Sequence, residues 1–192
     1  MHNDEISYFW PVDLSCFQPL LHGIGIEKRY ARHAFFLTQE VMPDHLGFVT
    51  GGVFREFAKD SDGKEHNKTF CFEGDFAGSY LDPQPGRPSP ASIQALTPGS
   101  LLLIPLTEFA SRVISEEPWL RAAHELAHRL LMKKFLREYQ LLTLSARERY
   151  ELLETAHPQL IREIPAFHLA SYLGISPVSL SRLRGGRKRK SS

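Results

Sequence analysis

The sequence predicts an α+β protein with an N-terminal antiparallel β-roll of the jelly-roll kind, a long central helix and a C-terminal helical domain. Three observations predict this order. Short apolar segments separated by turn residues occupy positions 34–115, no glycine or proline lies between positions 119 and 142, and residues 169–184 have the pattern of two short helices joined by a tight turn. We therefore expect a β-roll over 1–115, a connecting helix over 116–143 and a helix-turn-helix domain over 144–192.

The expected strands recur about every ten residues, which is typical of an antiparallel barrel or sandwich. Residues 53–57 have apolar side chains at both ends and two polar side chains between them, and we expect them to form a strand with one buried face. Turn residues separate the segments, and Gly63 and Gly99 are suited to the conformations that such turns require. The remaining expected strands are 47–50, 69–72, 92–96 and 101–105.

The central helix begins at Glu116, Glu117 and Pro118, residue types that are favoured in a first helical turn. Continued to position 142 it has about 25 residues and a length of about 37 Å. Such a helix extends beyond a small barrel, so we expect part of its apolar stripe to pack against the same helix of a second copy in a homodimer. The alternative is a helix that packs only on its own domain. The interface candidates are Ala123, Ala127, Leu131, Phe135, Tyr139 and Leu142.

The C-terminal helices carry their own start and stop signals. Ser145 and Glu148 match a capping box that begins a helix to about residue 155. A short helix over 166–173 follows Pro165 and ends at Gly174, and Ser176 is the expected N-cap of a last helix that starts at Pro177. Apolar residues at 169, 173, 175, 180 and 183 are spaced to hold these two helices together, which predicts a helix-turn-helix whose second helix enters the DNA major groove.

The charge distribution supports a nucleic-acid partner. The net charge is only +1, yet residues 180–192 contain six basic residues and no acid, while residues 1–179 contain 17 basic and 22 acidic residues. A cationic end on an acidic body is expected where the C-terminus meets a polyanion. The alternative is a tail that only adds solubility.

The chain resembles the Crp/Fnr family of bacterial transcriptional regulators from about residue 25 to 184. The resemblance lies in the order of strands and long helix and in the segments SARERYELL and ASYLGISPVSLSRLR. It implies a cyclic-nucleotide-binding-type β-roll acting as a sensor, a dimerising central helix and a DNA-binding domain, here without an evident C-terminal wing. Recognition-helix positions map onto Pro177, Val178, Ser181 and Arg182. An arginine grips guanine with two hydrogen bonds, so Arg182 is the best candidate for base reading.

We expect Ser176 and Ser179, with the backbone amides at the helix start, to hold phosphates. We expect the segment GGRKRKSS to be a flexible arm that adds salt-sensitive affinity. Many relatives have a glutamate where Val178 stands, so their operator sequence cannot be transferred. The full set of DNA-binding candidates is Ser176, Pro177, Val178, Ser179, Ser181, Arg182, Arg184, Arg187, Lys188, Arg189 and Lys190.

The β-roll departs from the cyclic-nucleotide pattern of the family. Ser79 stands where relatives have the ribose-binding glutamate, Pro90 stands near the place of the phosphate-binding arginine, and Arg87 is out of register. Without that guanidinium the cyclic phosphate loses a strong bidentate partner, so we do not expect cyclic AMP in the usual mode. A different small effector and a barrel that senses nothing both remain open. The ligand-binding candidates are Phe76, Gly78, Ser79, Tyr80, Ala91 and Ser92.

An enzyme-like motif occurs in the central helix. His124, Glu125 and His128 match H-E-x-x-H, in which two histidines bind zinc and the glutamate activates water. The third ligand would come from Glu148, Glu151 or Glu154. Ion pairs between Glu125 and the arginines at 121 and 129 explain the glutamate without a metal, and we prefer that interpretation.

The cysteine count and hydropathy limit other classes. Cys16 and Cys71 are too few for a disulfide framework or a four-cysteine cluster, and we expect no cofactor, metal or enzymatic activity. No apolar run is long enough to span a membrane and the N-terminus lacks a signal-peptide pattern, so we expect a cytoplasmic protein. The leading hypothesis is a homodimeric sequence-specific regulator that binds double-stranded DNA, with RNA polymerase and a small effector as further partners. The alternatives are a zinc-dependent hydrolase, a non-specific electrostatic DNA binder and a ligand-binding module with vestigial DNA binding.

Overall fold

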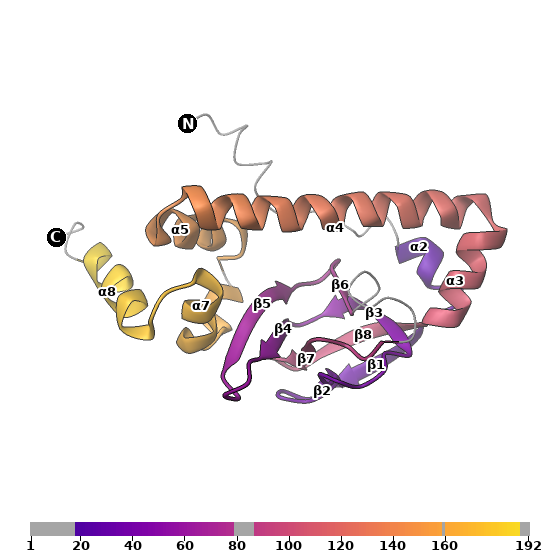
Figure 1. Cartoon of the computed structure of the whole chain (residues 1–192), viewed down its shortest axis with the longest axis horizontal. Coiled ribbons are helices and arrows are strands. Elements are labelled where there is room, and N and C mark those ends of the chain that lie inside the picture. The colour runs from indigo at the N-terminus through magenta and orange to yellow at the C-terminus, as the bar shows by residue number, and fades with distance from the viewer. Residues whose placement is uncertain (1–17, 79–86, 159, 189–192) are drawn as a thin grey trace. The chain divides into compact units, whose positions relative to one another are not determined.

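The computed structural model describes residues 18–78, 87–158 and 160–188 (Figure 1). The sequence-predicted sites at Ser79, Tyr80, Arg189 and Lys190 lie outside these ranges, as does Cys16. The described residues divide into two compact units, one ending at Leu131 and one beginning at Met132. The functional division predicted at 115/116 and 143/144 stays a prediction.

The N-terminal unit contains two four-stranded antiparallel sheets, which confirms the expected β-roll and the α+β class. One sheet has the order β1-β8-β3-β6 and the other β2-β7-β4-β5. Every pairing between the strands is antiparallel. The strands are β1 (Ile26–Tyr30), β2 (Phe35–Leu37), β3 (His45–Gly51), β4 (Phe54–Lys59), β5 (Glu65–Cys71), β6 (Phe76–Ala77), β7 (Ser92–Ala95) and β8 (Gly99–Pro105).

A buried cluster with members from both sheets forms the core of the roll. Val49, Phe54, Ile93, Ala95 and Leu101 belong to it and are almost completely buried. The ring of Tyr30 meets that of Phe54 edge to face at 5.8 Å between centroids. Because side chains alternate along a strand, the neighbouring residues of β3 and β8 point to the opposite face of their sheet.

That opposite face carries a second buried cluster with helical residues. Phe48 and Ile104 of the sheet are packed with Leu21 of α2 (Gln18–Leu21), Phe109 of α3 (Leu106–Ser115) and Trp119 of α4 (Glu117–Thr143). Phe109 and Trp119 are in edge-to-face contact at 5.9 Å. In Figure 1, α2 and α3 accordingly lie beside the N-terminal half of α4. This cluster anchors the long helix to the β-roll.

Two details of the predicted strand region were wrong. The first strand begins at Ile26 rather than near position 34, and residues 106–115, assigned to the strand region, form α3. Local ion pairs stabilise α3: Arg112 forms salt bridges with Glu108 at 2.8 Å and with Glu116 at 3.1 Å, each four residues away. Pairs at this spacing stabilise a helix and do not arise along a strand.

The predicted central helix is confirmed as the 27-residue α4. Its N-terminal part contributes Trp119, Ala123 and Leu126 to the cluster on the β-roll. Ala123, predicted at the dimer interface, is thus buried against the β-roll of the same chain. The other predicted interface residues lie on parts of the helix that are more open, and Leu131, Phe135, Tyr139 and Leu142 are exposed.

The C-terminal unit contains the end of α4 and four further helices, namely α5 (Ala146–Ala156), α6 (Leu160–Glu163), α7 (Ala166–Leu173) and α8 (Pro177–Lys188). The capping box is confirmed: the Glu148 amide donates to Ser145 Oγ at 3.3 Å, and the Ser145 amide donates to Glu148 Oε2 at 2.8 Å. Pro165 is the N-cap of α7. Within the described ranges, no helix is both long and apolar enough to cross a membrane.

The predicted flexible arm from residue 185 onward needs a correction. Helix α8 continues through Gly185 and Gly186 to Lys188. Glycine lowers helix propensity by about 1 kcal/mol relative to alanine, which weakens a helix without forbidding it. The first basic residues of the tail therefore extend the second helix of the helix-turn-helix.

Candidate nucleic-acid interface

Helices α7 and α8 form the helix-turn-helix that the sequence predicts. Leu169, Ala170 and Leu173 of α7 and Leu180 of α8 are buried. The turn between the helices depends on Gly174, whose φ of 69° lies in the left-handed region that glycine adopts without steric cost. The Ile175 amide then donates back to the Ala170 carbonyl at 3.0 Å. The orientation of α8 on α7 is therefore fixed by a short turn and a shared apolar contact.

The first turn of α8 is closed by serine side chains. The Ser179 amide donates to Ser176 Oγ at 3.1 Å, and the two hydroxyl oxygens lie 2.9 Å apart. Ser176 is thus the N-cap, as predicted, and no acidic residue lies in the first turn. Backbone amides and hydroxyls at a helix start without a competing carboxylate are suited to an anion such as a DNA phosphate.

The residues predicted to read bases lie together on the open surface of α8. Leu180 faces α7, while the residues around it on the helix are exposed to solvent. Val178 has an exposed fraction of 60% and offers an apolar side chain on this surface. The exposed candidates are Ser176, Pro177, Val178, Ser179, Ser181 and Arg182.

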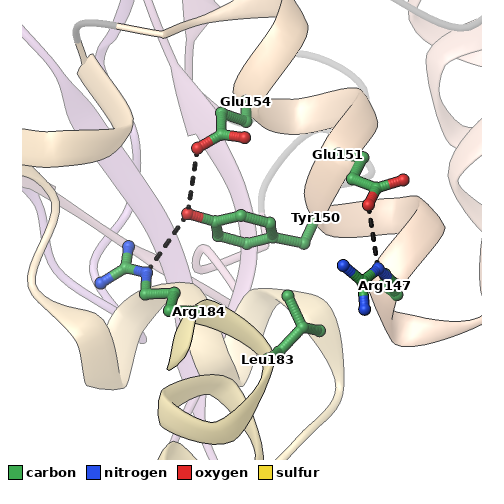
Figure 2. Close-up of a pocket in the computed structure, with 6 residues that line it drawn as sticks. All are labelled: Arg147, Tyr150, Glu151, Glu154, Leu183 and Arg184. Atoms are coloured by element: carbon green, nitrogen blue, oxygen red, sulfur yellow. Dashed lines mark hydrogen bonds and ion pairs between the residues drawn. The ribbon is translucent and has the colours of Figure 1, made fainter. Parts of the chain in front are cut away.

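Arg184 differs from Arg182 because it is engaged by α5. Its Nε donates to the hydroxyl of Tyr150 at 3.3 Å, and its guanidinium lies 5.6 Å from the centre of the Tyr150 ring. Tyr150 in turn donates to Glu154 at 3.4 Å. Figure 2 shows these residues around a cavity of about 160 Å³, which Arg147, Glu151 and Leu183 also line. Arg187 and Lys188 belong to α8, whereas Arg189 and Lys190 lie outside the described residues.

Two arginines that no sequence pattern singles out bind the C-terminal end of α7, next to the turn at Gly174. Arg137 of α4 donates from Nη2 to the carbonyl of Tyr172, and Arg149 of α5 donates to the carbonyl of Leu173 at 2.8 Å. Burial lowers the pKa of Arg137, and the nearby charge of Arg149 lowers it further. Their partners Tyr172 and Leu173 are far away along the chain, so no local sequence pattern indicates these contacts.

Comparisons with known proteins agree with this arrangement. Residues 27–115 match the family model of the cyclic nucleotide-binding domain. The structure of FixK2 from Bradyrhizobium japonicum is similar at 18% identity, covering 88% of this chain and 86% of that chain with a TM-score of 0.71. The chain has the fold of the Crp/Fnr regulators. The family resemblance inferred from the sequence is thereby confirmed for the β-roll and the order of the helices.

Two further structures have the Crp/Fnr fold in common with this chain. CLP from Xanthomonas campestris, described as a c-di-GMP responsive global regulator, is 15% identical, covers 93% of each chain and has a TM-score of 0.68. A CooA mutant from Carboxydothermus hydrogenoformans is 19% identical, covers 93% of this chain and 84% of that chain, and has a TM-score of 0.67. No curated protein matches the sequence significantly.

Four of the predicted ligand-binding residues lie within the described ranges, and Phe76, Ala91 and Ser92 among them are buried. Phe76 packs edge to face with Phe48 at 5.1 Å, in the cluster that the helices cover. Ser92 is buried, and its hydroxyl accepts a hydrogen bond from the backbone amide of Gln39 at 2.9 Å. Ala91 is buried as well. Gly78 has a φ of 139°. Phe76 is therefore a core residue between sheet and helices.

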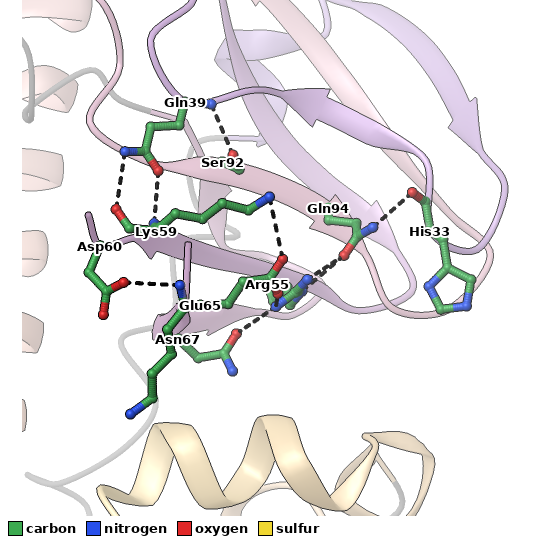
Figure 3. A network of polar contacts seen from close by, with 10 residues as sticks. His33, Gln39, Arg55, Lys59, Asp60, Glu65, Asn67, Ser92 and Gln94 are labelled. Atoms are coloured by element: carbon green, nitrogen blue, oxygen red, sulfur yellow. Dashed lines mark hydrogen bonds and ion pairs between the residues drawn. The ribbon is translucent and has the colours of Figure 1, made fainter. Parts of the chain in front are cut away.

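The β-roll also contains a buried polar network centred on Arg55. Arg55 of β4 is only 4% exposed, and its guanidinium lies 3.8 Å from the centre of the Phe57 ring. It donates to Gln94 Oε1 from Nε at 3.0 Å and from Nη2 at 2.7 Å, and it pairs with Glu65 at 2.7 Å (Figure 3). Burial lowers the pKa of Arg55, and Glu65 opposes this effect. The local sequence does not show that Arg55 is buried, because its partners come from the neighbouring strands β5 and β7.

The H-E-x-x-H residues lie on α4, and the glutamate is engaged in an ion pair. Arg129 Nε lies 2.5 Å from Glu125 Oε1, and this hydrogen bond lowers the pKa of Glu125. His124 and His128 are exposed. In the part of the chain that the structure describes, no group of three or more histidine, cysteine, aspartate or glutamate residues is arranged to hold a metal ion.

Proposed function

We propose that the protein is a homodimeric, sequence-specific DNA-binding transcriptional regulator of Crp/Fnr type. The observation that carries this proposal is the surface of α8, where Ser176 caps a helix start without acidic residues and Val178 and Arg182 are exposed behind it. A helix of this kind presents hydrogen-bond donors and an apolar contact to base edges in the major groove. CLP, which has the same fold, is described as a global regulator that links cell-cell signalling to virulence gene expression.

The dimer part of the proposal is supported by the exposed apolar residues of α4. Leu131, Phe135 and Leu142 have exposed fractions of 64%, 58% and 78%, and their spacing of four and seven residues puts them on one face of the helix. Large apolar side chains in such a row are typical of a helix that packs on a second helix. A second copy of α4 provides a matching surface, because a twofold axis brings the same residues together.

We further infer that an effector of the β-roll, where one acts, is not cyclic AMP bound in the usual mode. Between residues 74 and 96 the sequence contains a single arginine, Arg87, and its side chain is exposed. Titration calorimetry with cyclic AMP should show no binding at micromolar concentrations, and saturable binding with one site per chain would contradict this inference.

The function is tested by selecting bound duplexes from a random pool with the purified full-length protein, at near-physiological salt and without added ligand. Enrichment of a two-fold-related sequence with half-sites about one helical turn apart supports a dimeric sequence reader. Salt-sensitive binding without enrichment, both alone and in the presence of a cell extract's small molecules, would contradict sequence reading and favour an electrostatic binder.

A further inference from the structure

The C-terminal end of α7 is held by two arginines from two other helices of the same unit. Arg137 of α4 donates to the Tyr172 carbonyl, and Arg149 of α5 donates to the Leu173 carbonyl at 2.8 Å. Carbonyls in the last turn of a helix have no partner within the helix and carry its negative dipole end. Two guanidinium groups at this position therefore satisfy acceptors that would otherwise need water or a cap.

The contact is buried and geometrically specific. The Arg137 guanidinium lies 4.0 Å from the centre of the Tyr172 ring, and the Tyr172 side chain is buried. Gln140, one turn further along α4, is also buried and lines the same small cavity as both arginines. Burial lowers the pKa of Arg137, and repulsion by the charge of Arg149 lowers it further. Placing two cations here therefore has an electrostatic cost, which the helix carbonyls and the Tyr172 ring offset.

Arg149 connects two places at once. Besides the Leu173 carbonyl it donates from Nη1 to the carbonyl of Leu144, the first residue after α4. One planar guanidinium thus bridges the end of α4 and the end of α7. A lysine carries the same charge on a single donor atom and cannot reproduce such a fork.

These contacts connect the proposed dimer face on α4 with the proposed DNA-binding helices α7 and α8. The C-terminal part of α4 carries Phe135 and Leu142 of the proposed dimer face, and α7 carries α8 through the turn at Gly174 and the buried Leu180. Leu141 of α4 also comes close to this turn, because a Cβ added at Gly174 would lie 3.7 Å from Leu141 Cδ2. The end of α7 is therefore where the orientation of α8 is tied to α4.

We propose that Arg137 and Arg149 are positioning residues: a two-arginine clamp that fixes the helix-turn-helix on α4 and thereby sets the half-site spacing that the dimer reads. This inference rests on the proposed dimeric DNA-reading function. Two recognition helices carried by one rigid dimer match one spacing, whereas loosely attached helices accept several spacings at lower affinity.

The test compares the wild type with Arg137→Lys, Arg149→Lys and the double variant on duplexes derived from the selected operator. One set contains a single half-site, and the other contains both half-sites with the spacing shortened or lengthened by one or two base pairs. We expect single-site affinity to change by less than about threefold, while the preference for the native spacing falls by about tenfold. Arg147→Lys is the matched control, since Arg147 is an exposed α5 arginine paired with Glu151 at 3.0 Å.

Unchanged spacing preference in variants whose thermal unfolding matches the wild type would overturn the clamp. A second measurement does not depend on DNA. Spin labels at Thr143→Cys on α4 and Ser181→Cys on α8, in a Cys16→Ser background diluted with unlabelled protein, report the distance between these helices. Cys71 is buried and unsuited to labelling. We expect a broader distance distribution in the double variant, and an unchanged width would contradict the clamp.

The two measurements separate the clamp from the function on which it rests. A wild type that enriches no sequence but whose distance distribution broadens on substitution would refute the DNA-reading function and retain the clamp. A wild type with a clear operator whose variants keep both spacing preference and distance width would refute the clamp and retain the function. If the double variant does not fold, Arg149→Lys alone is decisive, because it removes the bridge and keeps the charge.

Discussion

Arg184 of α8 and Tyr150 of α5 are joined by a hydrogen bond of 3.3 Å from the arginine Nε to the tyrosine hydroxyl (Figure 2). The pair fastens the middle of α8 to the helix that begins the C-terminal domain. It also separates two arginines that look equivalent in the sequence, because Arg182, two residues earlier, is exposed on α8.

Tyr150→Phe should destabilise the protein by about 1 kcal/mol, because it removes a hydroxyl that contacts both Arg184 and Glu154 while keeping the buried ring. Denaturant unfolding of Tyr150→Phe, Arg184→Ala and the double variant measures the interaction between the two residues. We expect the double variant to be less destabilised than the sum of the single variants. Strict additivity would show that the hydrogen bond contributes nothing to stability.

Arg182→Ala should relax recognition at one base pair of each half-site by about 1–3 kcal/mol, because one side chain reads one pair. Fluorescence anisotropy with the selected operator and its single-base variants measures this loss. Arg147→Ala is the control, since it removes an equal charge from an exposed position on α5. Equal weakening on all duplexes would instead identify Arg182 as a phosphate contact.

Replacing Leu131 and Phe135 together by aspartate should shift the protein from dimer to monomer at micromolar concentration. Both side chains are exposed on one face of α4, and charges there oppose the burial that a helix pair requires. Sedimentation equilibrium gives the mass. Ile114→Asp is the control, because Ile114 of α3 is 87% exposed and outside this stripe. A monomeric wild type would contradict the dimer directly.

Ser145→Ala should cost about 1 kcal/mol of stability, because it removes the N-cap of α5. Hydrogen bonds with Ser145 hold the pKa of Glu148 below its usual range, and the one with the Ser145 side chain has a larger effect than the one with its backbone. A lowered carboxyl pKa stabilises the fold above the unfolded-state pKa, and this stabilisation is lost as pH falls through the folded-state pKa. The difference between wild type and variant should therefore shrink between about pH 5 and 3 in denaturant unfolding, with Ser111→Ala as control.

The purified protein should retain no more zinc after dialysis than the His124→Ala, His128→Ala double variant. Glu125, the glutamate that a hydrolase would need, is paired with Arg129, and the described residues supply no third metal ligand. Elemental analysis of both proteins gives the zinc content. One zinc per chain in the wild type, lost in the double variant, would revive the hydrolase interpretation.

The sequence was most informative where structure depends on near neighbours. The capping box at Ser145, the left-handed turn at Gly174 and the helix start at Ser176 each involve residues within a few positions of one another. Helix α4 was equally legible, because a long segment free of glycine and proline repeats its apolar residues with the helical period. The pattern of short apolar segments predicted the β-roll but not α3, which is indicated by charged residues spaced four apart.

The sequence by itself thus determined the class of fold, the order of its elements and the residues that α8 exposes, because these follow from local periodicity and from caps and turns. Only the tertiary structure decided that Phe76 packs beneath the helices, that Arg55 is buried, and that Arg137 and Arg149 meet at the end of α7. Residues 137 and 172 are far apart along the chain, and nothing in their local patterns distinguishes them from solvent-facing neighbours. Their role comes from the desolvation and hydrogen bonding that folding imposes when distant segments are brought together.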